Sequence, residues 1–291
     1  MFSRDYLKKP AWIKHRIPSG PEYKKTLELL RQYGLATVCE EARCPNIGEC
    51  WQRGSATIMI MGKVCTRACR FCAVKTGDPA GFLDENEPQN VARVVKELGL
   101  RYVVITSVDR DDLPDAGSGH YARCVSSIKQ VSGTGIEVLI PDFGGQEERL
   151  SRIVNEKPTV IGHNIETVKR LTPLIRDRRC GYERSLTTLL AIKRLDHACV
   201  TKSSIMVGLG EQTDEIAAAL DDLAAAAVDI VTIGQYLQPT RKHMSVQKYY
   251  SLKEFDELKT LGEHAGIKHV LSGPMVRSSY RAAEILDMFK G

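Results

Sequence analysis

The fold is decided by the stretch Thr57-Ile-Met-Ile-Met61-Gly-Lys-Val-Cys65-Thr-Arg-Ala-Cys69-Arg-Phe-Cys72. Its apolar beginning, bounded by glycine, is typical of a short buried strand. Three cysteines follow at spacings of four and three residues. Because the functional loops of a parallel α/β fold follow the carboxyl ends of its strands, the stretch predicts a sulfur-rich site at that end of the first strand.

Five more strand-like runs follow along the chain and alternate with helical patterns. Strands are expected at 57–61, 102–106, 136–140, 159–161, 203–207 and 229–233, and helices at 88–98, 121–131, 183–195 and 213–227. Six β-then-α units in a row predict a parallel sheet covered by helices and curled into a barrel or an open part-barrel. We therefore expect an α/β fold, a partial (β/α)6 barrel with N- and C-terminal extensions.

Two flanks of the chain do not fit the repeat. Residues 1–56 have little strand pattern and carry three cysteines, whereas residues 251–291 read as a helix over 252–265, a short strand and a polar tail. The predicted organisation is thus an N-terminal extension over 1–56, the barrel over 57–250, and a C-terminal extension over 251–291.

The composition excludes several classes of protein. A hydrophobic content of 43% is enough to order the chain, which excludes disorder. The most apolar long window, 217–233, contains three aspartates and falls short of the roughly 20 apolar residues of a membrane span. The start MFSRDYLKKPAW has no apolar core of a signal peptide, so we expect a cytoplasmic protein in a reducing compartment.

The charge gives little reason to expect nucleic acid as a partner. The net charge is +5, spread along the chain without a basic stripe interleaved with aromatic residues. The densest basic stretch, 176–179, contains an aspartate, and we expect it to be a solvated helix end.

The nine cysteines point to metal or redox chemistry rather than to disulfides, because no export signal is present. Six of them lie between Cys39 and Cys72. The other three lack partners at ligand spacing, and we expect small buried or partly buried side chains there; they are Cys124, Cys180 and Cys199.

Each cysteine triplet can serve a metal. Three thiolates in the loop from Cys65 to Cys72 would leave one iron of a four-iron cluster without a protein ligand, and such an open position suits catalysis. A three-cysteine zinc site or buried structural thiols are the alternatives. The second triplet is Cys39, Cys44 and Cys50, where Pro45 and Gly48 are expected to form tight turns; its spacing alone fits zinc equally well.

Several motifs carry a family resemblance. The pattern C-x3-C-x-aromatic-C, with Phe71 before the last cysteine, resembles the radical S-adenosylmethionine superfamily. Over most of its length the chain is similar to the lipoyl synthase family. The motifs are EEARCPNIGECW at 40–51, VVITSVDRDDLPD at 103–115, PDF at 141–143, HNIET at 163–167, GQYLQPTRKH at 234–243 and RSSYRA at 277–282.

The resemblance implies two 4Fe–4S clusters. One would be held by Cys65, Cys69 and Cys72 and would bind S-adenosylmethionine. The other, an auxiliary cluster, would be held by Cys39, Cys44, Cys50 and Ser279. Without the resemblance, Ser279 would be interpreted as part of a helix cap.

The resemblance also places cofactor and substrate contacts after the strands. The expected S-adenosylmethionine contacts are Phe71, Ser107, Asp109, Asn164, Glu166, Gly208 and Glu211, and the expected substrate contacts are Arg241 and His243. The superfamily pattern G-x-I-x-G-x-x-E has Ser204 and Met206 in place of its first two specified residues. The acidic run over 107–115 is interpreted as a solvated loop, with a divalent-cation loop as the alternative.

The implied activity is that of a radical sulfurtransferase, inserting sulfur at C6 and C8 of an octanoyl chain on a lysine of a lipoyl carrier domain or H-protein. The auxiliary cluster would supply the sulfur. The implied partners include a ferredoxin- or flavodoxin-type electron donor and an Fe–S cluster carrier. Two alternatives remain at this point: another radical sulfur-insertion enzyme of the biotin synthase kind, and a zinc-stabilised binding protein.

Overall fold

Each of the six strands expected from the sequence is present in the computed structural model, which describes residues 7–13, 18–52, 56–280 and 282–284. The observed strand ends lie within three residues of the predicted ends. The strands are β2 (Thr57–Ile60), β5 (Tyr102–Ser107), β6 (Gly135–Leu139), β7 (Val160–Gly162), β8 (Val200–Val207) and β9 (Ile230–Gln235).

The chain forms two units, which are named here after β5 and β8. The β5 unit comprises residues 15–67, 74–161 and 279–291, and the β8 unit comprises residues 1–14, 68–73 and 162–278. The C-terminal segment from Ser279 onward therefore belongs to the same unit as the cysteines of the N-terminal flank.

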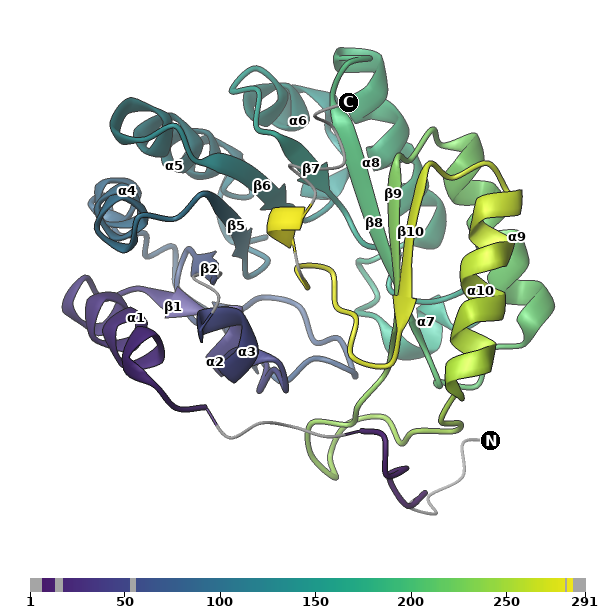
Figure 1. The fold of residues 1–291 in the computed structure, drawn as a ribbon. Coiled ribbons are helices and arrows are strands. Elements are labelled where there is room, and N and C mark those ends of the chain that lie inside the picture. The colour runs from purple at the N-terminus through teal and green to yellow at the C-terminus, as the bar shows by residue number, and fades with distance from the viewer. Residues whose placement is uncertain (1–6, 14–17, 53–55, 281, 285–291) are drawn as a thin grey trace. The chain divides into compact units, whose positions relative to one another are not determined.

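The β5 unit is built on a mixed sheet. The short strand β1 (Ala36–Thr37) pairs antiparallel with β2, whereas β2 pairs parallel with β5 and β5 pairs parallel with β6. All four residues of β2 are buried, as expected of a parallel strand covered on both faces. The helices α4 (Glu87–Leu98) and α5 (Ser118–Val131) lie side by side against this sheet (Figure 1).

Helix α5 begins three residues earlier than its apolar pattern predicts. The Asp115 carboxylate accepts hydrogen bonds from the backbone N–H groups of Gly117 and Gly119, at 2.9 and 2.8 Å. These bonds satisfy donors that the first turn of a helix leaves free, and they fix its start at Ser118.

The flanks of the β5 unit are helical. The N-terminal flank forms α1 (Pro21–Gln32), α2 (Val38–Glu41) and α3 (Ile47–Gln52), and near the other end of the chain η2 (Ala282–Glu284) packs on β5 (Figure 1). The prediction of a tight turn at Gly48 is wrong, because Gly48 lies in the first turn of α3; Pro45 does lie in a turn. The remaining elements are β3 (Val64–Cys65), which pairs with β4 (Lys75–Thr76), and then η1 (Phe143–Gly145) and α6 (Glu147–Val154).

The β8 unit contains parallel strands in the order β8, β9 and β10 (His269–Gly273). Its helices are α7 (Thr172–Ile175), α8 (Tyr182–Leu195), α9 (Thr213–Ala225) and α10 (Leu252–His264). The predictions of a helix near 252–265 and of a following short strand are confirmed. Figure 1 shows α9 and α10 next to each other, with α10 also packed on β10.

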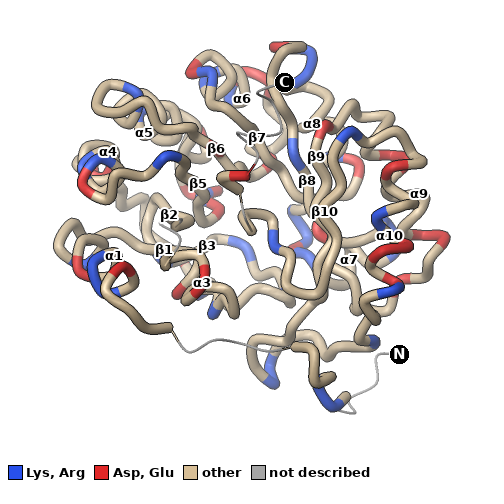
Figure 2. Tube along the Cα trace, in the orientation of Figure 1, with Lys and Arg blue, Asp and Glu red and all other residues tan. Residues whose placement is uncertain are grey.

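The surface helices carry both signs of charge. Figure 2 shows basic and acidic residues interspersed along α1, α4 and α10. Among the described residues, no helix combines the length and the apolar character needed to cross a membrane.

The expectation of a fully solvated basic stretch at 176–179 is wrong for Arg176. Its side chain is buried, and its guanidinium donates to the Ser185 hydroxyl at 2.9 Å and to the Ile165 carbonyl at 3.3 Å. These two bonds are made inside the β8 unit, which the charge pattern alone could not indicate.

Candidate functional site

The predicted site residues divide between the two units. The β5 unit contains Cys39, Cys44, Cys50, Cys65, Ser107, Asp109 and Ser279. The β8 unit contains Cys69, Phe71, Cys72, Asn164, Glu166, Gly208, Glu211, Arg241 and His243.

Cys65 lies at the end of β3, shortly after β2, in a loop held by backbone hydrogen bonds. Its sulfur accepts N–H bonds from Asp109 at 3.3 Å and from Arg67 at 3.4 Å, and its carbonyl accepts one from Gly77 at 2.9 Å. Donors directed at a cysteine sulfur stabilise its thiolate form and are one means by which proteins adjust iron–sulfur centres.

Arg67, between the first two cysteines of the loop, is buried in a network of carboxylates. Its guanidinium binds both oxygens of Asp111 at 2.8 and 3.0 Å, and both oxygens of Asp142 at 3.0 and 3.1 Å. Asp109 lies 3.3 Å away from it as well. The side chain of Asp142 is fully buried, so this arginine provides the charge that makes its burial tolerable.

The carboxylate network around Arg67 accounts for the PDF motif at 141–143 and for the acidic run over 107–115. Burial disfavours the charged form of Arg67, but its hydrogen bonds and charge interactions with Asp111, Asp109 and Asp142 outweigh burial and raise its pKa. Asp142 of the PDF motif thus binds Arg67 of the cysteine loop. The acidic run over 107–115 was expected to be a solvated loop; instead its aspartates bind Arg67, bind Arg110 or cap α5.

Cys69 has its own backbone donor in the β8 unit. The N–H of Asp177 donates to the Cys69 sulfur at 3.3 Å, and the Asp177 carboxylate accepts the N–H of Ala68 at 2.9 Å. Arg179 lowers the pKa of Asp177 by hydrogen bonding to its carboxylate. The segment after α7 therefore fixes the backbone and the sulfur of this part of the cysteine loop.

Cys180 interacts with Cys69 of the cysteine loop, although the two are far apart in the sequence. A hydrogen bond with the Cys180 thiol, and then burial, raise the pKa of Cys69. The prediction that Cys124, Cys180 and Cys199 are buried or partly buried is confirmed. Sequence separation concealed the contact, because more than 100 residues lie between Cys69 and Cys180.

His243 is fixed against the last cysteine of the loop. Its Nε2 lies 2.9 Å from the Cys72 carbonyl oxygen, which can only accept, so Nε2 carries a proton. Its Nδ1 lies 2.8 Å from the Thr240 hydroxyl. Arg241, two residues earlier, is exposed.

Asn164 and Glu166 follow β7 and contact each other. The Asn164 amide donates to Glu166 Oε1 at 3.0 Å, and burial raises the pKa of Glu166. The backbone of Glu166 has a φ of 67° and bridges to β8 through its N–H and carbonyl. A backbone conformation that is costly for a side chain of this kind persists only where its surroundings hold it.

Gly208 and Glu211 form a tight turn after β8. Gly208 has a φ of 103°, and a Cβ there would lie 2.5 Å from the Lys248 carbonyl oxygen, so only glycine fits. The Glu211 carboxylate accepts the N–H groups of Gly208 and Leu209 at 2.5 and 2.9 Å and the Tyr250 hydroxyl at 2.9 Å. Glu211 thus shapes this turn from within.

Ser107, at the carboxyl end of β5, has a buried hydroxyl without a hydrogen-bond partner among the described residues. Such atoms are rare in folded proteins and mark places where another group is accommodated. Phe71, in the β8 unit, packs its partly buried ring against that unit's hydrophobic core.

The second cysteine triplet is organised by short helices. Cys39 lies in α2 and is buried, whereas Cys44 and Cys50 are half-buried. The N–H of Cys44 donates to the Cys39 carbonyl at 2.9 Å, and the N–H of Cys50 donates to the Asn46 carbonyl at 2.9 Å. Burial raises the pKa of Cys39 to about 11.

The second half of the RSSY motif, Ser279 and Tyr280, belongs to the same β5 unit as this triplet. The Tyr280 hydroxyl is 3.5 Å from Glu49 Oε1, and Glu49 directly precedes Cys50 in α3. Ala282 is fully buried against Tyr102 and Val104 of β5. Both contacts are made by residues that follow Ser279 in the chain, and they hold the segment directly after it.

The described residues contain no group of three or more His, Cys, Asp and Glu side chains arranged around a single metal ion. The ligands of a four-iron cluster each bind a different iron atom. The cysteine triplets therefore need not surround one ion in order to hold such a cluster.

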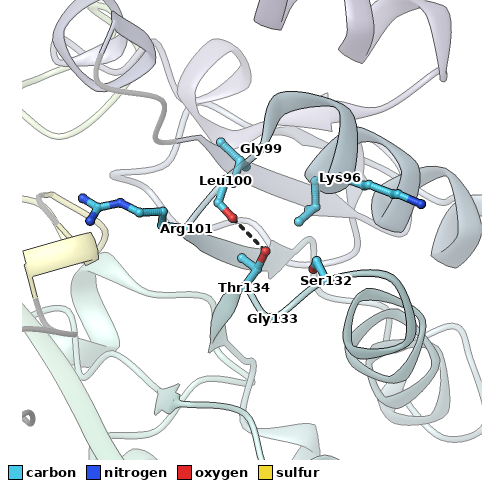
Figure 3. A pocket seen from close by; sticks show the side chains of 8 residues that line it. Lys96, Gly99, Leu100, Arg101, Ser132, Gly133 and Thr134 are labelled. Atoms are coloured by element: carbon cyan, nitrogen blue, oxygen red, sulfur yellow. Dashed lines mark hydrogen bonds between the residues drawn. The ribbon is translucent and has the colours of Figure 1, made fainter.

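A hollow of about 470 Å³ lies elsewhere in the β5 unit, near the ends from which β5 and β6 begin (Figure 3). It is lined by Lys96, Gly99, Leu100, Arg101 and residues 132–134, and the Thr134 hydroxyl donates to the Leu100 carbonyl there at 2.7 Å. None of the predicted site residues lines it.

Comparisons with known proteins give consistent matches. A family model described as the Radical SAM superfamily matches residues 59–223, and one described as the N-terminal domain of lipoyl synthase matches residues 3–44. The lipoyl synthase of Halorhodospira halophila is 53% identical over 96% of this chain and 84% of its own length. That of Francisella tularensis subsp. novicida is 50% identical over 96% of this chain and 86% of its own length.

Solved structures agree at the level of the fold. SuiB of Streptococcus suis, bound to its precursor peptide SuiA, has a TM-score of 0.59 at 10% identity, covering 90% of this chain; the chain spans 55% of SuiB. Methylornithine synthase (PylB) has a TM-score of 0.55 at 15% identity, covering 85% of this chain and 80% of its own. The predicted α/β fold with a partial barrel is confirmed.

Proposed function

The chain belongs to the lipoyl synthase family of the radical S-adenosylmethionine superfamily, and on that premise we propose which of its residues carry each part of the reaction. The activity is that of a radical sulfurtransferase, which inserts two sulfur atoms at C6 and C8 of an octanoyl chain borne by a lipoyl carrier domain. Those carbons are unactivated, and no side-chain base can take a proton from them.

Formation of the radical and supply of the sulfur need two different bound groups. When bound, S-adenosylmethionine with its 4Fe–4S cluster supplies the radical, and an auxiliary 4Fe–4S cluster would supply the sulfur. The protein's own residues hold these groups, orient the acyl chain and exclude water.

We assign Cys65, Cys69 and Cys72 to the cluster that binds S-adenosylmethionine. Their spacing within eight residues supports this assignment, as do the backbone donors already directed at the sulfurs of Cys65 and Cys69. Three protein ligands would leave one iron of the cluster open to S-adenosylmethionine. Arg67 and Asp142 hold the backbone of this loop in its place.

We assign Cys39, Cys44, Cys50 and Ser279 to the auxiliary cluster. The observation that carries this proposal is the 3.5 Å approach of Tyr280, the residue after Ser279, to Glu49 in the helix that contains Cys50. A serine oxygen is a harder ligand than a thiolate and a weaker partner for iron in a sulfur cluster. The Ser279 ligand would therefore be released more easily than a thiolate when the cluster gives up sulfur.

We assign S-adenosylmethionine contacts to Phe71, Ser107, Asp109, Asn164, Glu166, Gly208 and Glu211. The unpaired Ser107 hydroxyl is a ready donor for a bound polar group. Asn164 and Glu166 have oxygens that accept hydrogen bonds from ribose hydroxyls. Gly208 and Glu211 act through the backbone of their turn, because the Glu211 carboxylate is already bonded within it.

Arg241 and His243 are assigned to the substrate. His243 lies against the cysteine loop through the Cys72 carbonyl, and exposed Arg241 is accessible to an acidic carrier protein. We propose the H-protein or another octanoylated lipoyl domain as the carrier. A ferredoxin- or flavodoxin-type protein would deliver electrons, and an Fe–S carrier would rebuild the auxiliary cluster, in the cytoplasm.

Anaerobic analysis and turnover with an octanoyl-lysine peptide test the division of labour. We expect close to two four-iron clusters per chain. Cys65→Ala should abolish cleavage of S-adenosylmethionine, whereas Cys44→Ala should retain cleavage and lose sulfur insertion. Loss of both activities in both variants would contradict the assignment, and zinc without sulfide would contradict both clusters.

A further inference from the structure

The segment 109–112, which follows β5, contacts the chain around the first cysteine of the cysteine loop. The Asp109 N–H donates to the Cys65 sulfur at 3.3 Å, and the Asp109 carbonyl accepts the N–H of Thr66 at 3.0 Å. The Asp111 carboxylate accepts the Thr66 hydroxyl at 2.8 Å. All of these residues belong to the β5 unit, so this part of the cysteine loop is formed against the segment after β5.

Arg110 extends these contacts to both sides of Cys65 along the chain. Its side chain is 0% exposed, and its Nη1 donates to the Met61 carbonyl at 3.1 Å. Its Nε and Nη2 bind the two oxygens of Asp112 at 2.8 and 2.7 Å, and Asp112 also accepts the N–H of Gly81 at 3.0 Å. Because a guanidinium is a rigid fork of donors, Arg110 holds both partners at once.

Met61 lies at the turn from β2 into the cysteine loop and needs to be held. Its φ is 66°, a conformation that is costly for a residue with a side chain and persists only where its surroundings fix it. Its N–H donates to Glu87 Oε2 at 2.8 Å, and its carbonyl accepts Arg110. Its sulfur lies so close to Gly117 that a Cβ on that glycine would be 2.2 Å away. Neighbouring segments therefore fix its backbone and its side chain.

Glu87 is itself fixed by a buried histidine. The guanidinium of Arg123 can only donate, and it lies 3.2 Å from His120 Nδ1, so this nitrogen accepts and Nε2 carries the proton. His120 Nε2 donates to the Glu87 oxygen that also binds Met61, at 2.6 Å. The carboxylate that holds the turn is thus oriented by two donors.

We propose that Arg110 is a positioning residue for the cluster that binds S-adenosylmethionine. By joining the Met61 carbonyl to Asp112, it fixes the backbone from which Cys65 extends before a cluster binds. This inference rests on the proposed function, because it needs the cluster assigned to the cysteine loop. Residues that orient metal ligands from behind contribute to metal retention, and their loss typically costs about 10–100-fold in affinity or activity.

Hydrogen exchange tests the cysteine loop without a cluster. In the cluster-free full chain, Arg110→Met removes the bonds of the guanidinium, so the amides of Met61 and Gly81 should exchange about tenfold faster. The Gly119 amide, which donates to Asp115 at 2.8 Å in the same unit, is the internal reference and should keep its rate. An equal rise at Gly119 would mean general loosening of the unit and would overturn the positioning role.

Iron release tests the effect on the cluster itself. In a Cys39→Ala, Cys44→Ala, Cys50→Ala background, the full chain should hold about four iron and four sulfide ions. Arg110→Met in this background should release iron to a chelator at least about tenfold faster. It should also need about tenfold more S-adenosylmethionine to change the electron paramagnetic resonance spectrum of the reduced cluster. A change in either quantity supports the proposal, whereas unchanged values of both overturn it, even if amide exchange is faster.

Lys193→Met is the matched control. Lys193 also donates to a backbone carbonyl and to a buried carboxylate, those of Cys199 at 2.6 Å and Asp229 at 2.5 Å. Asp229 directly precedes β9 in the β8 unit, at the amino end of that strand. The control should leave iron release and the spectrum unchanged. Effects equal to those of Arg110→Met would overturn the proposal.

A milder variant decides the question if Arg110→Met has no cooperative unfolding transition. Asp112→Asn keeps the size of the partner and removes its charge, so iron release should become faster in the same direction. Unchanged release in this variant would then overturn the proposal. A background protein without iron and sulfide would instead overturn the assignment of Cys65, Cys69 and Cys72 to a cluster.

Discussion

The Tyr280 hydroxyl lies 3.5 Å from Glu49 Oε1, although 231 residues separate the two in the sequence. The contact brings the end of the chain to the helix that follows the second cysteine of the N-terminal triplet. Ser279 directly precedes Tyr280 and belongs to the same β5 unit as Glu49. A ligand set drawn from both ends of the chain requires such a contact.

Ser279→Ala should stop sulfur insertion while leaving cleavage of S-adenosylmethionine intact, because it removes the oxygen ligand that we propose for the auxiliary cluster. Product mass spectrometry and measurement of 5′-deoxyadenosine test this. Ser278→Ala is the matched control, since it changes the neighbouring serine only. Normal insertion of both sulfurs by Ser279→Ala would refute the ligand role.

Arg67→Met should lower the free energy of unfolding by about 3–5 kcal/mol, because it leaves the buried Asp142 carboxylate without its counter-charge. Urea denaturation of the cluster-free protein measures this. Iron content should fall as well, since the loop that contains Cys65 loses its anchor.

Arg70→Met is the control for that experiment. Arg70 lies in the same loop, is exposed, and donates to the Leu174 carbonyl at 3.0 Å. Its substitution should change the stability by no more than about 0.5 kcal/mol. Equal losses of unfolding free energy in the two variants would contradict the prediction that the buried Arg67 network stabilises the fold more than exposed Arg70 does.

Gly208→Ala should be more destabilising than Gly266→Ala. Both glycines have a positive φ, 103° and 93°, so alanine is strained at each by about 1–2 kcal/mol. Only at Gly208 would the new methyl group also overlap Gln235 and the Lys248 carbonyl, which adds about 1–3 kcal/mol. The midpoints of urea denaturation compare the two variants. Similar losses of stability would show that the turn at Gly208 shifts to accommodate the methyl group.

The stability of α10 should depend on acid through Glu254. Lys248, and then the N–H of Ser251, lower the pKa of Glu254 to about 2. Because this pKa lies below the unfolded value of 4.5, the carboxylate stabilises the fold fully above pH 4.5 and loses that effect as the pH falls toward 2. Glu254→Gln should therefore make the dependence of unfolding free energy on pH shallower in that interval.

Denaturation of cluster-free protein at several pH values, followed by circular dichroism, tests the Glu254 prediction. Ser251→Ala removes the partner in the capping box, at a cost of about 1 kcal/mol, and should reduce the slope in the same direction. Parallel curves for the wild type and Glu254→Gln would contradict the prediction.

The strands and the cysteine triplets could be predicted because each is a local pattern. A buried parallel strand such as β2 needs an apolar run, and a loop ligand set needs only short spacing. The helices α2 and α3 were missed, because four and six residues give too few turns to show a periodicity.

The contacts that complete the candidate site could not be predicted, because they join distant segments. Nothing in the sequence near Arg67 indicates that Asp142 is its buried partner, or that Cys180 contacts Cys69. The domain boundaries at 56 and 250 remain a prediction.

The source of the inserted sulfur is the central claim, and isotope labelling tests it most directly. The protein is reconstituted anaerobically with ³⁴S-sulfide, freed of excess sulfide, and given S-adenosylmethionine, reductant and an octanoyl-lysine peptide for one turnover. The assignment of Cys39, Cys44, Cys50 and Ser279 predicts that both sulfur atoms of the product are ³⁴S and that Cys44→Ala gives none. A product containing unlabelled sulfur, or a Cys44→Ala variant that still forms it, would contradict the claim.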